Sequence, residues 1–205
     1  MIELKNVKFY YQKNNIVFSN LNYTFEKGNI YFLTGENGVG KTTIAKLILG
    51  ILNPISGSID KKDINQTGYL PDFNGLYPQL TVLENIKYRM ALYNQNYQEH
   101  KDMVESALRQ YKIYKYLNTD VSSLSLGTEK KVAILCVAMI PCELLILDEP
   151  TGGLDKSSRL EALKMVVELR NENRIVLCIT HDQDLLRSGK GIILSMKDEN
   201  IYEIY

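Results

Sequence analysis

An octapeptide near the amino terminus, GENGVGKT at residues 35–42, has the residue types and spacing of a phosphate-binding loop. It matches G-x-x-x-x-G-K-[ST], a pattern expected by chance in under about 1% of chains this long. Its glycines let backbone N–H groups turn inward around phosphates, at the positive end of a following helix. Lys41 can reach the β- and γ-phosphates, and Thr42 offers a hydroxyl to Mg²⁺. We therefore predict a nucleotide cradle made of Gly35, Asn37, Gly38, Gly40, Lys41, Thr42 and Thr43.

A pair of carboxylates ends a second candidate strand, LLILDEP. Its four aliphatic residues are typical of a buried parallel strand, which delivers Asp148 to the sheet edge where ligands bind. Because Pro150 ends the strand, Glu149 can face the same edge. One carboxylate can hold Mg²⁺ or its waters, and the other can polarise an attacking water. An acid pair alone is as often simply solvated, but the phosphate loop upstream favours nucleotide hydrolysis.

The elements that must position these motifs follow an α/β order. Alternating residues predict strands before residue 26, NIYFLTG predicts a buried strand, and the helix after the loop ends at Gly50. Thr81 and Glu84 form a capping-box pattern before a helical stretch, and a second helix is expected at about 99–116. An aliphatic strand, an amphipathic helix, another strand and a hairpin follow. This order predicts an α/β P-loop fold with a parallel-sheet core, an antiparallel β subdomain and an inserted helical lobe.

The composition argues against several other classes of protein. Apolar residues make up 45% of the 205, and 24 basic residues balance 24 acidic ones, so no global basic field favours nucleic acid. The longest apolar run is interrupted by Pro141 and Glu143, and the first residues do not resemble a secretory signal. Three cysteines among aliphatic residues show no metal-type spacing, which indicates reduced core thiols. We expect a cytoplasmic chain, peripheral to a membrane at most, without a nucleic-acid partner.

With these motifs, nearly the whole chain resembles the ATP-binding subunits of ABC transporters. The resemblance implies one ABC ATPase domain over residues 1–205, with 1–72 and 140–205 as the nucleotide-binding core and 73–139 as the helical subdomain. It also implies ATP and Mg²⁺ as cofactors, and a membrane-spanning partner on the inner face of the cell membrane. Two cassettes, identical or different, would pair head to tail. The short length and the LSLG variant resemble small bacterial exporter subunits.

Three further residues take roles through this resemblance. Tyr11 matches the aromatic residue that stacks on adenine, with Tyr10 as the competing choice and core packing as the plainer alternative. Asp155 ends TGGLD, which resembles the D-loop, and it can equally cap the next helix. His181 ends the strand CITH at the position of the family's switch histidine, which contacts the γ-phosphate.

The stretch LSLGTEKK, residues 124–131, lies where the family carries its LSGGQ signature. In the family this motif starts a helix and contacts the γ-phosphate of ATP bound to a partner chain. Ser125 and Gly127 match, and they retain a hydroxyl and a side-chain-free backbone at a helix N-terminus. Leu126 replaces the first glycine and is expected to point into the helical lobe. Thr128 replaces the glutamine.

The segment GYLPD resembles the Q-loop, but Asp72 stands where the family usually has glutamine. An ionised aspartate can ligate Mg²⁺ but cannot donate a hydrogen bond as an amide does. We therefore expect the aspartate at this position to affect the coupling of ATP hydrolysis to the membrane partner more than it affects ATP binding. Phe73, Leu76 and Tyr77 would border the groove in which that partner docks, or would pack in the core.

Three rival hypotheses remain beside ATP-driven transport. A soluble ABC-type ATPase is the main one, although the chain lacks the long coiled coil of DNA-repair relatives and the second cassette of translation relatives. A GTPase would need N-K-x-D, which is absent. A non-hydrolysing regulatory module is disfavoured by intact Lys41 and Glu149. We predict Glu149, His181 and Lys41 as catalytic residues, and Thr42, Asp148 and Asp72 as Mg²⁺ ligands; the sequence does not predict the cargo.

Overall fold

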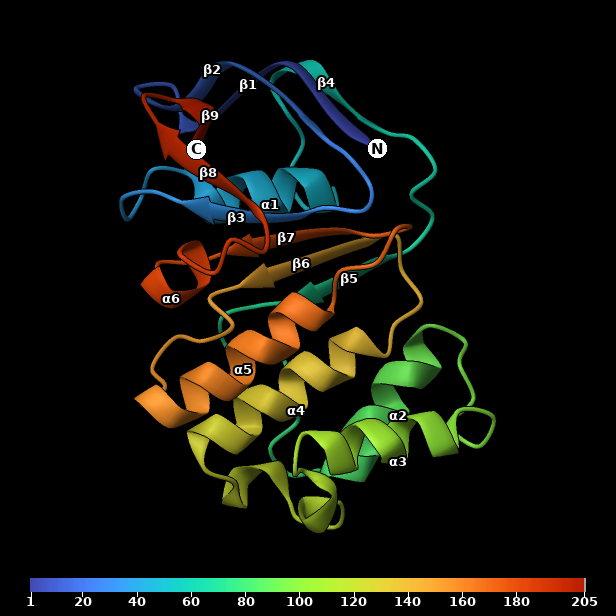
Figure 1. The fold of residues 1–205 in the computed structure, drawn as a ribbon. Coiled ribbons are helices and arrows are strands. Elements are labelled where there is room, and N and C mark those ends of the chain that lie inside the picture. The colour runs from blue at the N-terminus through green and yellow to red at the C-terminus, as the bar shows by residue number, and fades with distance from the viewer. Residues whose placement is uncertain (205) are drawn as a thin grey trace. The chain divides into compact units, whose positions relative to one another are not determined.

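The computed structural model describes residues 1–204, which divide into two compact units. The β-rich unit contains Met1–Thr67, Cys142–Glu149 and the chain from Arg170 onward. The helical unit contains Gly68–Pro141 and Pro150–Leu169. The division expected from the sequence stays a prediction; it differs from these units mainly at residues 150–169, which it assigned to the nucleotide-binding core. Figure 1 shows the elements of both units in chain order.

A three-stranded antiparallel sheet opens the β-rich unit. Its strands, in the spatial order β2-β1-β4, are β1 (Ile2–Gln12), β2 (Asn15–Phe25) and β4 (Ser56–Lys61). Ile2, Leu4, Val7 and Phe9 of β1 are buried, because alternate side chains point to the covered face of a strand. A two-residue turn joins β1 to β2, and Gln12 lies opposite Asn15. The alternating amino-terminal sequence thus predicted β1 and β2 correctly, whereas β4 was not predicted.

The parallel core of the same unit contains short strands, of which three adjacent ones are buried on both faces. Its order is β6-β7-β3-β8, followed by the antiparallel β9, with β3 (Ile30–Thr34), β6 (Leu144–Asp148), β7 (Ile175–Ile179), β8 (Ile192–Lys197) and β9 (Asn200–Ile204). Ile179 lies opposite both Leu33 and Asp148. The carboxyl ends of β3, β6 and β7 are therefore level, which brings the loops that follow them to one edge.

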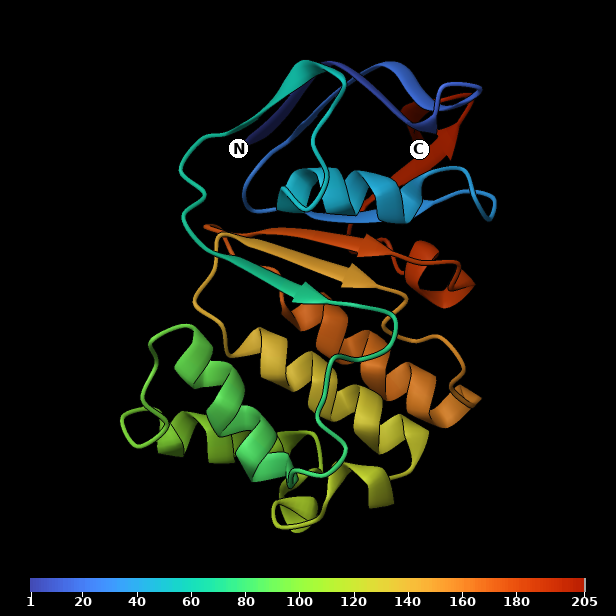
Figure 2. The same ribbon diagram turned by 180° about the vertical axis from the view of Figure 1, so that it is seen from behind.

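Helix α1 (Lys41–Leu49) follows β3 and carries the phosphate-binding sequence at its start. Figures 1 and 2 show it lying between the antiparallel sheet and the parallel strands. Ile44, Ala45 and Ile48 are fully buried, and Gly50 ends the helix in a left-handed conformation, as its sequence predicts. The short helix α6 (Gln183–Leu186) follows β7. The buried side chains of α1 and its direct connection to β3 fix the start of α1 at the carboxyl edge of the strands.

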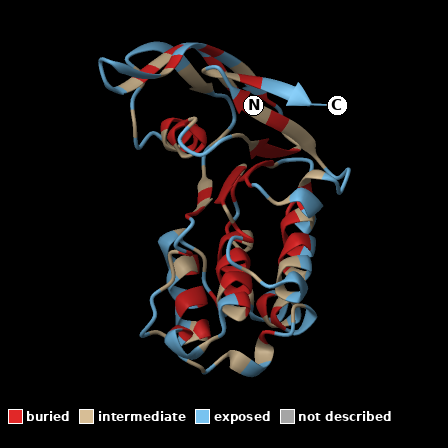
Figure 3. Ribbon diagram, turned by 90° about the vertical axis from the view of Figure 1, so that its left-hand side faces the viewer, coloured by how far each residue is buried: buried red, intermediate tan, exposed pale blue. Residues whose placement is uncertain are grey.

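The helical unit is built around the buried helix α4, as the burial colours in Figure 3 indicate. Its elements are β5 (Thr67–Leu70), which starts at the unit boundary, α2 (Val82–Leu92), α3 (Lys101–Gln110), η1 (Tyr114–Tyr116), η2 (Val121–Ser123), α4 (Leu126–Ala138) and α5 (Lys156–Glu168). Glu84 N–H donates to Thr81 Oγ1 at 3.2 Å, and Thr81 N–H donates to Glu84 Oε2 at 2.8 Å. The predicted capping box is confirmed.

Helix α3 is shorter than the sequence suggested. The apolar spacing predicted a helix to about residue 116, but α3 ends at Gln110. Lys112 adopts a left-handed φ of 60°, and Ile113 N–H returns to the carbonyl of Leu108 at 2.7 Å. This closing turn stops the helix and starts η1 in a new direction.

No helix within the described residues is long and apolar enough to cross a membrane.

Candidate nucleotide-binding site

The phosphate loop between β3 and α1 depends on glycine at its two ends. Gly40 caps α1 with φ 113°, and a Cβ atom there would lie 2.6 Å from Val17 Cγ1. Gly35 has φ 148°, and a Cβ atom there would lie 2.6 Å from the Met196 carbonyl oxygen. Both positions combine an unfavourable φ with no room for a side chain. The loop therefore needs these glycines to curl over the helix N-terminus, where backbone N–H groups favour anions.

Lys41 places a positive charge inside this loop. Its Nζ donates to the carbonyl oxygens of Gly35 at 2.8 Å and Glu36 at 2.9 Å, and only 8% of the residue is exposed. Burial lowers the pKa of Lys41, while the carboxylates of Glu149 and Asp148 oppose that change. The ammonium thus faces both the loop and the two acids, which suits a group that neutralises phosphate oxygens.

Thr42 and Asp148 form an oxygen pair beside the loop. The hydroxyl of Thr42 donates to Asp148 Oδ2 at 3.0 Å, although 106 residues separate them in the chain. Asp148 is buried at the end of β6, with 5% of its surface exposed. A hydroxyl and a carboxylate are the hard oxygen donors that Mg²⁺ prefers. The residues therefore fit the predicted metal, and they approach each other as the sequence motifs predicted.

Glu149 and His181 lie at the same edge. Glu149 has a left-handed φ of 48°, which ends the alternation of β6, and its N–H donates to the carbonyl of Ile179 at 3.0 Å. His181 Nε2 lies 3.6 Å from Glu149 Oε1. Burial raises the pKa of Glu149, against the opposing influence of His181. A carboxylate with a raised pKa next to an imidazole is a suitable acceptor for a proton from water.

These groups adjoin an open hollow of about 530 Å³ in the β-rich unit. Its lining is formed by Thr34, Gly35, Glu36, Asn37, His181 and Ser195. The sequence analysis named Asn37 and His181 but missed Thr34 and Ser195, which lie opposite each other on β3 and β8. The signal for Ser195 was present, because it is a polar residue inside the aliphatic strand GIILSMK. The hollow lies directly over the loop in which a phosphate chain is expected.

Tyr11 lies over the start of α1. Its hydroxyl and Thr43 Oγ1 are 3.2 Å apart, and its ring meets Phe9 edge-on at 5.0 Å. The ring is 55% exposed, so it is not core packing, whereas Tyr10 lies opposite Ile16 in the sheet. The structure therefore brings Tyr11 rather than Tyr10 to Thr43 of the cradle. An exposed ring held in this way offers a surface for a planar base.

Ser125 begins the signature helix in the helical unit. It is the N-cap of α4, with its Oγ accepting from Thr128 N–H at 3.4 Å and lying 3.0 Å from Thr128 Oγ1. The expectation that Leu126 points into the helical lobe was wrong, since Leu126 is 46% exposed. It occupies the first turn of α4, where its side chain faces outward and its Cδ2 lies near Gly153. The signature therefore presents a serine and a leucine at an exposed helix N-terminus.

Gly127 has a packing role that the sequence did not reveal. A Cβ atom there would lie 2.4 Å from Ser158 Oγ and 2.7 Å from Ser158 Cβ. Gly127 therefore allows α4 to approach α5 closely, whatever it does for a nucleotide.

Replacing Gly127 by alanine is expected to destabilise the chain by about 1–3 kcal/mol, the usual cost of overpacking. The added methyl group would collide with Ser158 and push α4 away from α5. Thermal unfolding, followed by circular dichroism, measures the effect. The control is Gly38→Ala, whose added Cβ atom meets nothing within 4 Å although φ is unfavourable. Equal melting temperatures for Gly127→Ala and the parent would contradict the packing role.

Two other predicted residues also lie in the helical unit. Asp155 caps α5, accepting from the N–H groups of Ser157 at 2.9 Å and Ser158 at 3.0 Å, so the capping alternative is confirmed. Its role toward a nucleotide stays a prediction. Asp72 is exposed, and its carbonyl oxygen accepts from Lys130 Nζ at 2.9 Å. The structure does not test its predicted role on Mg²⁺.

Together, the glycine loop with its buried lysine, the hydroxyl–carboxylate pair and the carboxylate–histidine pair define a P-loop nucleoside triphosphatase. A profile of the family described as ABC transporter matches residues 18–152. The chain belongs to the ABC transporter family, in which it is an ATP-binding subunit and an ATPase. The predicted ABC ATPase fold and function are thereby confirmed.

The relatives support this assignment over almost the whole chain. The zinc uptake system ATP-binding protein ZurA of Listeria innocua is 30% identical, with 99% of this chain and 85% of ZurA covered. A protein of Clostridium perfringens described as an ABC transporter ATP-binding protein is 30% identical over 95% of this chain. The chain spans only 37% of the length of that second relative.

Solved structures agree with the fold. The structure of an ATP binding subunit of an ABC transporter has a TM-score of 0.87 at 23% identity, covering 100% of this chain and 89% of that one. The structure of cbiO1 from Clostridium perfringens, which is part of the ABC transporter complex cbiONQ, has a TM-score of 0.81 at 25% identity. That match covers 98% of this chain and 86% of cbiO1.

Proposed function

We propose that the chain hydrolyses ATP with Mg²⁺ to drive transport through a separate membrane-spanning subunit. The observation that carries this proposal is the convergence of three groups on one sheet edge. They are the buried ammonium of Lys41, the oxygen pair of Thr42 and Asp148, and Glu149 beside His181. Each is the chemical type that phosphoryl transfer to water requires.

The reaction divides among these residues. The cradle predicted from the sequence, with the ammonium of Lys41 inside it, binds the β- and γ-phosphates and offsets their charge. Thr42 and Asp148 would hold Mg²⁺, which supplies charge stabilisation for the transferred group. Glu149 accepts a proton as the water oxygen bonds to the γ-phosphorus, the bridging P–O bond breaks and ADP leaves. His181, 3.6 Å from Glu149, donates to the γ-phosphate oxygens.

The remaining predicted residues contact the adenine base of ATP or the second cassette. Tyr11 stacks on adenine, which its 55% exposure allows. Ser125 and Gly127 complete the site of a partner cassette, and Asp155 lies at the same interface. The exposed N-cap hydroxyl of Ser125 supports this role, because a helix N-terminus favours a phosphate. The second cassette is a copy of this chain or a related one.

A membrane-spanning subunit is the partner that would use the hydrolysis. Phe73 is 76% exposed and Tyr77 47%, while Leu76 is partly buried, so the first two offer a docking surface. The cbiO1 structure, described as part of the ABC transporter complex cbiONQ, supports such a partnership. The partnership would hold this chain at the inner face of a membrane. The exporter-like type favoured by the sequence finds no support in the relatives, since ZurA belongs to a zinc uptake system. A soluble ABC-type ATPase remains the alternative.

Purified chain with ATP and Mg²⁺ is expected to release inorganic phosphate, and EDTA is expected to abolish this release. The reason is that two oxygen ligands and one lysine cannot offset the charge of a triphosphate without the metal. A continuous phosphate assay measures the rate, and excess Mg²⁺ added after EDTA serves as the control. Release that continues in EDTA would refute the predicted metal dependence. A chain that binds ATP but releases no phosphate would support the regulatory-module hypothesis.

As the solution is acidified, the rate of hydrolysis is expected to fall. This fall should begin at a higher pH than it would with an ordinary glutamate as the base. Glu149 acts as a base only when ionised, and burial raises its pKa above the ordinary value of 4.5. Activity is therefore lost as pH falls through the raised pKa. Since His181 opposes that rise, His181→Asn should move the acid limb further upward. A pH–rate profile of kcat tests both statements, and a limb that moves downward in His181→Asn would contradict them.

A further inference from the structure

The turn at residues 71–75, which we call the Asp72 turn, has a constrained backbone. Asn74 N–H donates to the Pro71 carbonyl at 3.0 Å, and Gly75 N–H donates to the Phe73 carbonyl at 2.9 Å. Asn74 and Gly75 are both left-handed, with φ 66° and 62°. Glycine adopts this region freely and asparagine tolerates it better than most residues, so the sequence of the turn suits its backbone.

Side chains from two helices hold the Asp72 turn in place. Lys130 Nζ donates to the Asp72 carbonyl at 2.9 Å, and Asn74 Nδ2 donates to Glu129 Oε1 at 3.1 Å. Arg89 of α2 donates to the Gly75 carbonyl at 2.9 Å. Lys130 and Asn74 are each only 5% exposed. A charged amine buried to this degree is costly unless its hydrogen bonds are maintained, so the Lys130 contact is a strong restraint.

The tip of the turn nevertheless faces outward. Asp72 is exposed, and the ring of Phe73 is 76% exposed. A held backbone that displays an aromatic ring can transmit a force applied to that ring, because the turn does not yield. In the proposed function, this exposed Phe73 is the contact for the membrane partner.

The anchor lies on the helix that carries the signature. Ser125 is the N-cap of α4, and Lys130 follows five residues later on the same helix. An α-helix rises 1.5 Å per residue, so about 7.5 Å of continuous helix separates the two. A displacement of the Asp72 turn would therefore move Ser125 through a short rigid element.

We propose that Lys130 is a positioning residue, which fastens the Asp72 turn to the signature helix so that partner docking at Phe73 and ATP engagement at Ser125 are coupled. We place Lys130 on no reacting atom, and we assign its effect to the hydrogen bond with the Asp72 carbonyl. The proposal rests on the proposed function, because it assumes that Ser125 engages ATP bound to a second cassette. Asp72 cannot donate a hydrogen bond as the family's usual glutamine does. In this proposal, the buried amine of Lys130 takes over the coupling role instead.

The chain contains no tryptophan, so Phe73→Trp would introduce a single indole at the tip of the turn, which can be excited selectively over the tyrosines. In a Glu149→Gln background, which retains ATP, adding ATP and Mg²⁺ is expected to change the quenching of that indole by acrylamide. Lys130→Met, which keeps the apolar stem but removes the amine, is expected to abolish the change. Lys130→Arg, which can still donate, is expected to retain it. A fluorescent ATP analogue measures binding separately in every variant.

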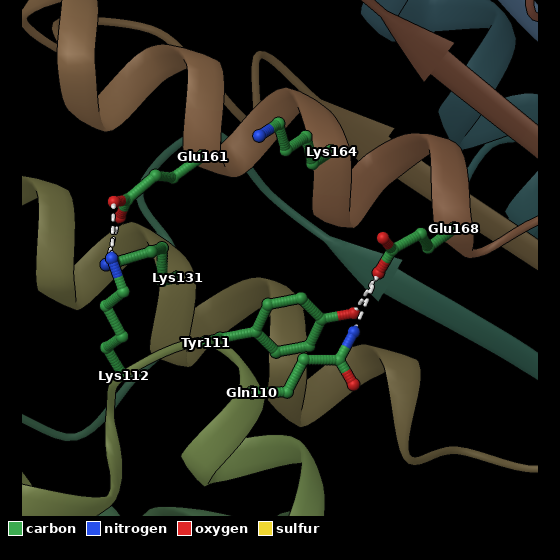
Figure 4. A pocket seen from close by; sticks show the side chains of 7 residues that line it. All are labelled: Gln110, Tyr111, Lys112, Lys131, Glu161, Lys164 and Glu168. Atoms are coloured by element: carbon green, nitrogen blue, oxygen red, sulfur yellow. Dashed lines mark hydrogen bonds and ion pairs between the residues drawn. The ribbon is translucent and has the colours of Figure 1, made fainter.

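The matched control is Lys131→Met on the same helix. Lys131 is also buried, but its Nζ pairs with Glu161 of α5 at 2.7 Å and lines a separate polar pocket of about 250 Å³ (Figure 4). Removing it deletes a comparable charged contact without touching the Asp72 turn. The indole response should persist in Lys131→Met. A response equally lost in both variants would indicate general loosening of α4 and would overturn the assignment to Lys130.

Hydrogen–deuterium exchange tests the anchor without depending on ATP. In Lys130→Met, amides of residues 73–76 should exchange on the order of tenfold faster, the effect of losing one hydrogen bond to a charged donor. Unchanged exchange there, or an ATP response of the indole that survives Lys130→Met, would overturn the proposal. So would an indole that never responds although ATP binds. Absence of ATP binding in all variants would instead refute the proposed function.

Discussion

Lys41→Met is expected to lower the affinity for ATP by about a hundredfold, which corresponds to roughly 3 kcal/mol for a charged hydrogen-bonding group lost from phosphates. The ammonium lies inside the loop, held by the carbonyls of Gly35 and Glu36, where no other cation of the cradle can replace it. Methionine keeps the length and apolar stem of lysine, so the fold should tolerate the change. Isothermal titration with ATP and Mg²⁺ measures the affinity.

The control for this variant lies on the same helix. Lys46→Met removes a lysine from the last turn of α1, away from the loop, and should leave the affinity unchanged. The melting temperature of both variants shows whether the fold is intact. ATP affinity within a factor of three of the parent in Lys41→Met would count against the cradle as the phosphate site.

Glu149→Gln is expected to slow hydrolysis by about 10²–10⁴-fold, the usual contribution of a general base. The amide is nearly isosteric, but it cannot accept the proton that leaves the attacking water. ATP binding should remain, because Glu149 is not part of the cradle. Single-turnover hydrolysis, with binding measured in parallel, separates the two effects.

Glu36→Gln is the matched control for the loss of charge. Glu36 lines the hollow together with His181 and is exposed, so this variant removes one nearby acid without removing the base. Its rate should remain close to that of the parent. If Glu149→Gln retained most of the rate, or if both variants slowed equally, Glu149 would not be the base and local charge would be the better explanation.

The core of the site could be predicted from sequence because its geometry is mostly local. The glycine loop, its lysine and the helix after it follow one another in eight residues, and the φ values of Gly35 and Gly40 fit their glycines. The pairing of Thr42 with Asp148 joins distant residues. It was nevertheless predictable, because parallel strands end at one edge and each motif follows a buried strand.

The contacts that were missed depend on how helices pack. Nothing near Gly127 in the sequence indicates that Ser158 lies against it, and the outward direction of Leu126 follows from the placement of α4. The end of α3 at Gln110 is set by the left-handed Lys112, which an ordinary lysine does not signal. The contact of Lys130 with Asp72 likewise joins residues 58 positions apart. The periodicity of apolar residues indicates which face of a helix or strand is buried. It does not indicate which distant residues that face contacts, and the missed features depend on such contacts.

The mass of Glu149→Gln in solution, measured by light scattering with ATP and Mg²⁺, tests the central claim that each site is completed by a second cassette. We expect a particle of twice the 23.5 kDa of the chain, which dissociates when ADP replaces ATP. Ser125→Arg should prevent its formation, because a bulky cation would replace the exposed N-cap hydroxyl. A particle that binds ATP yet remains at 23.5 kDa would contradict a site shared between two copies of this chain.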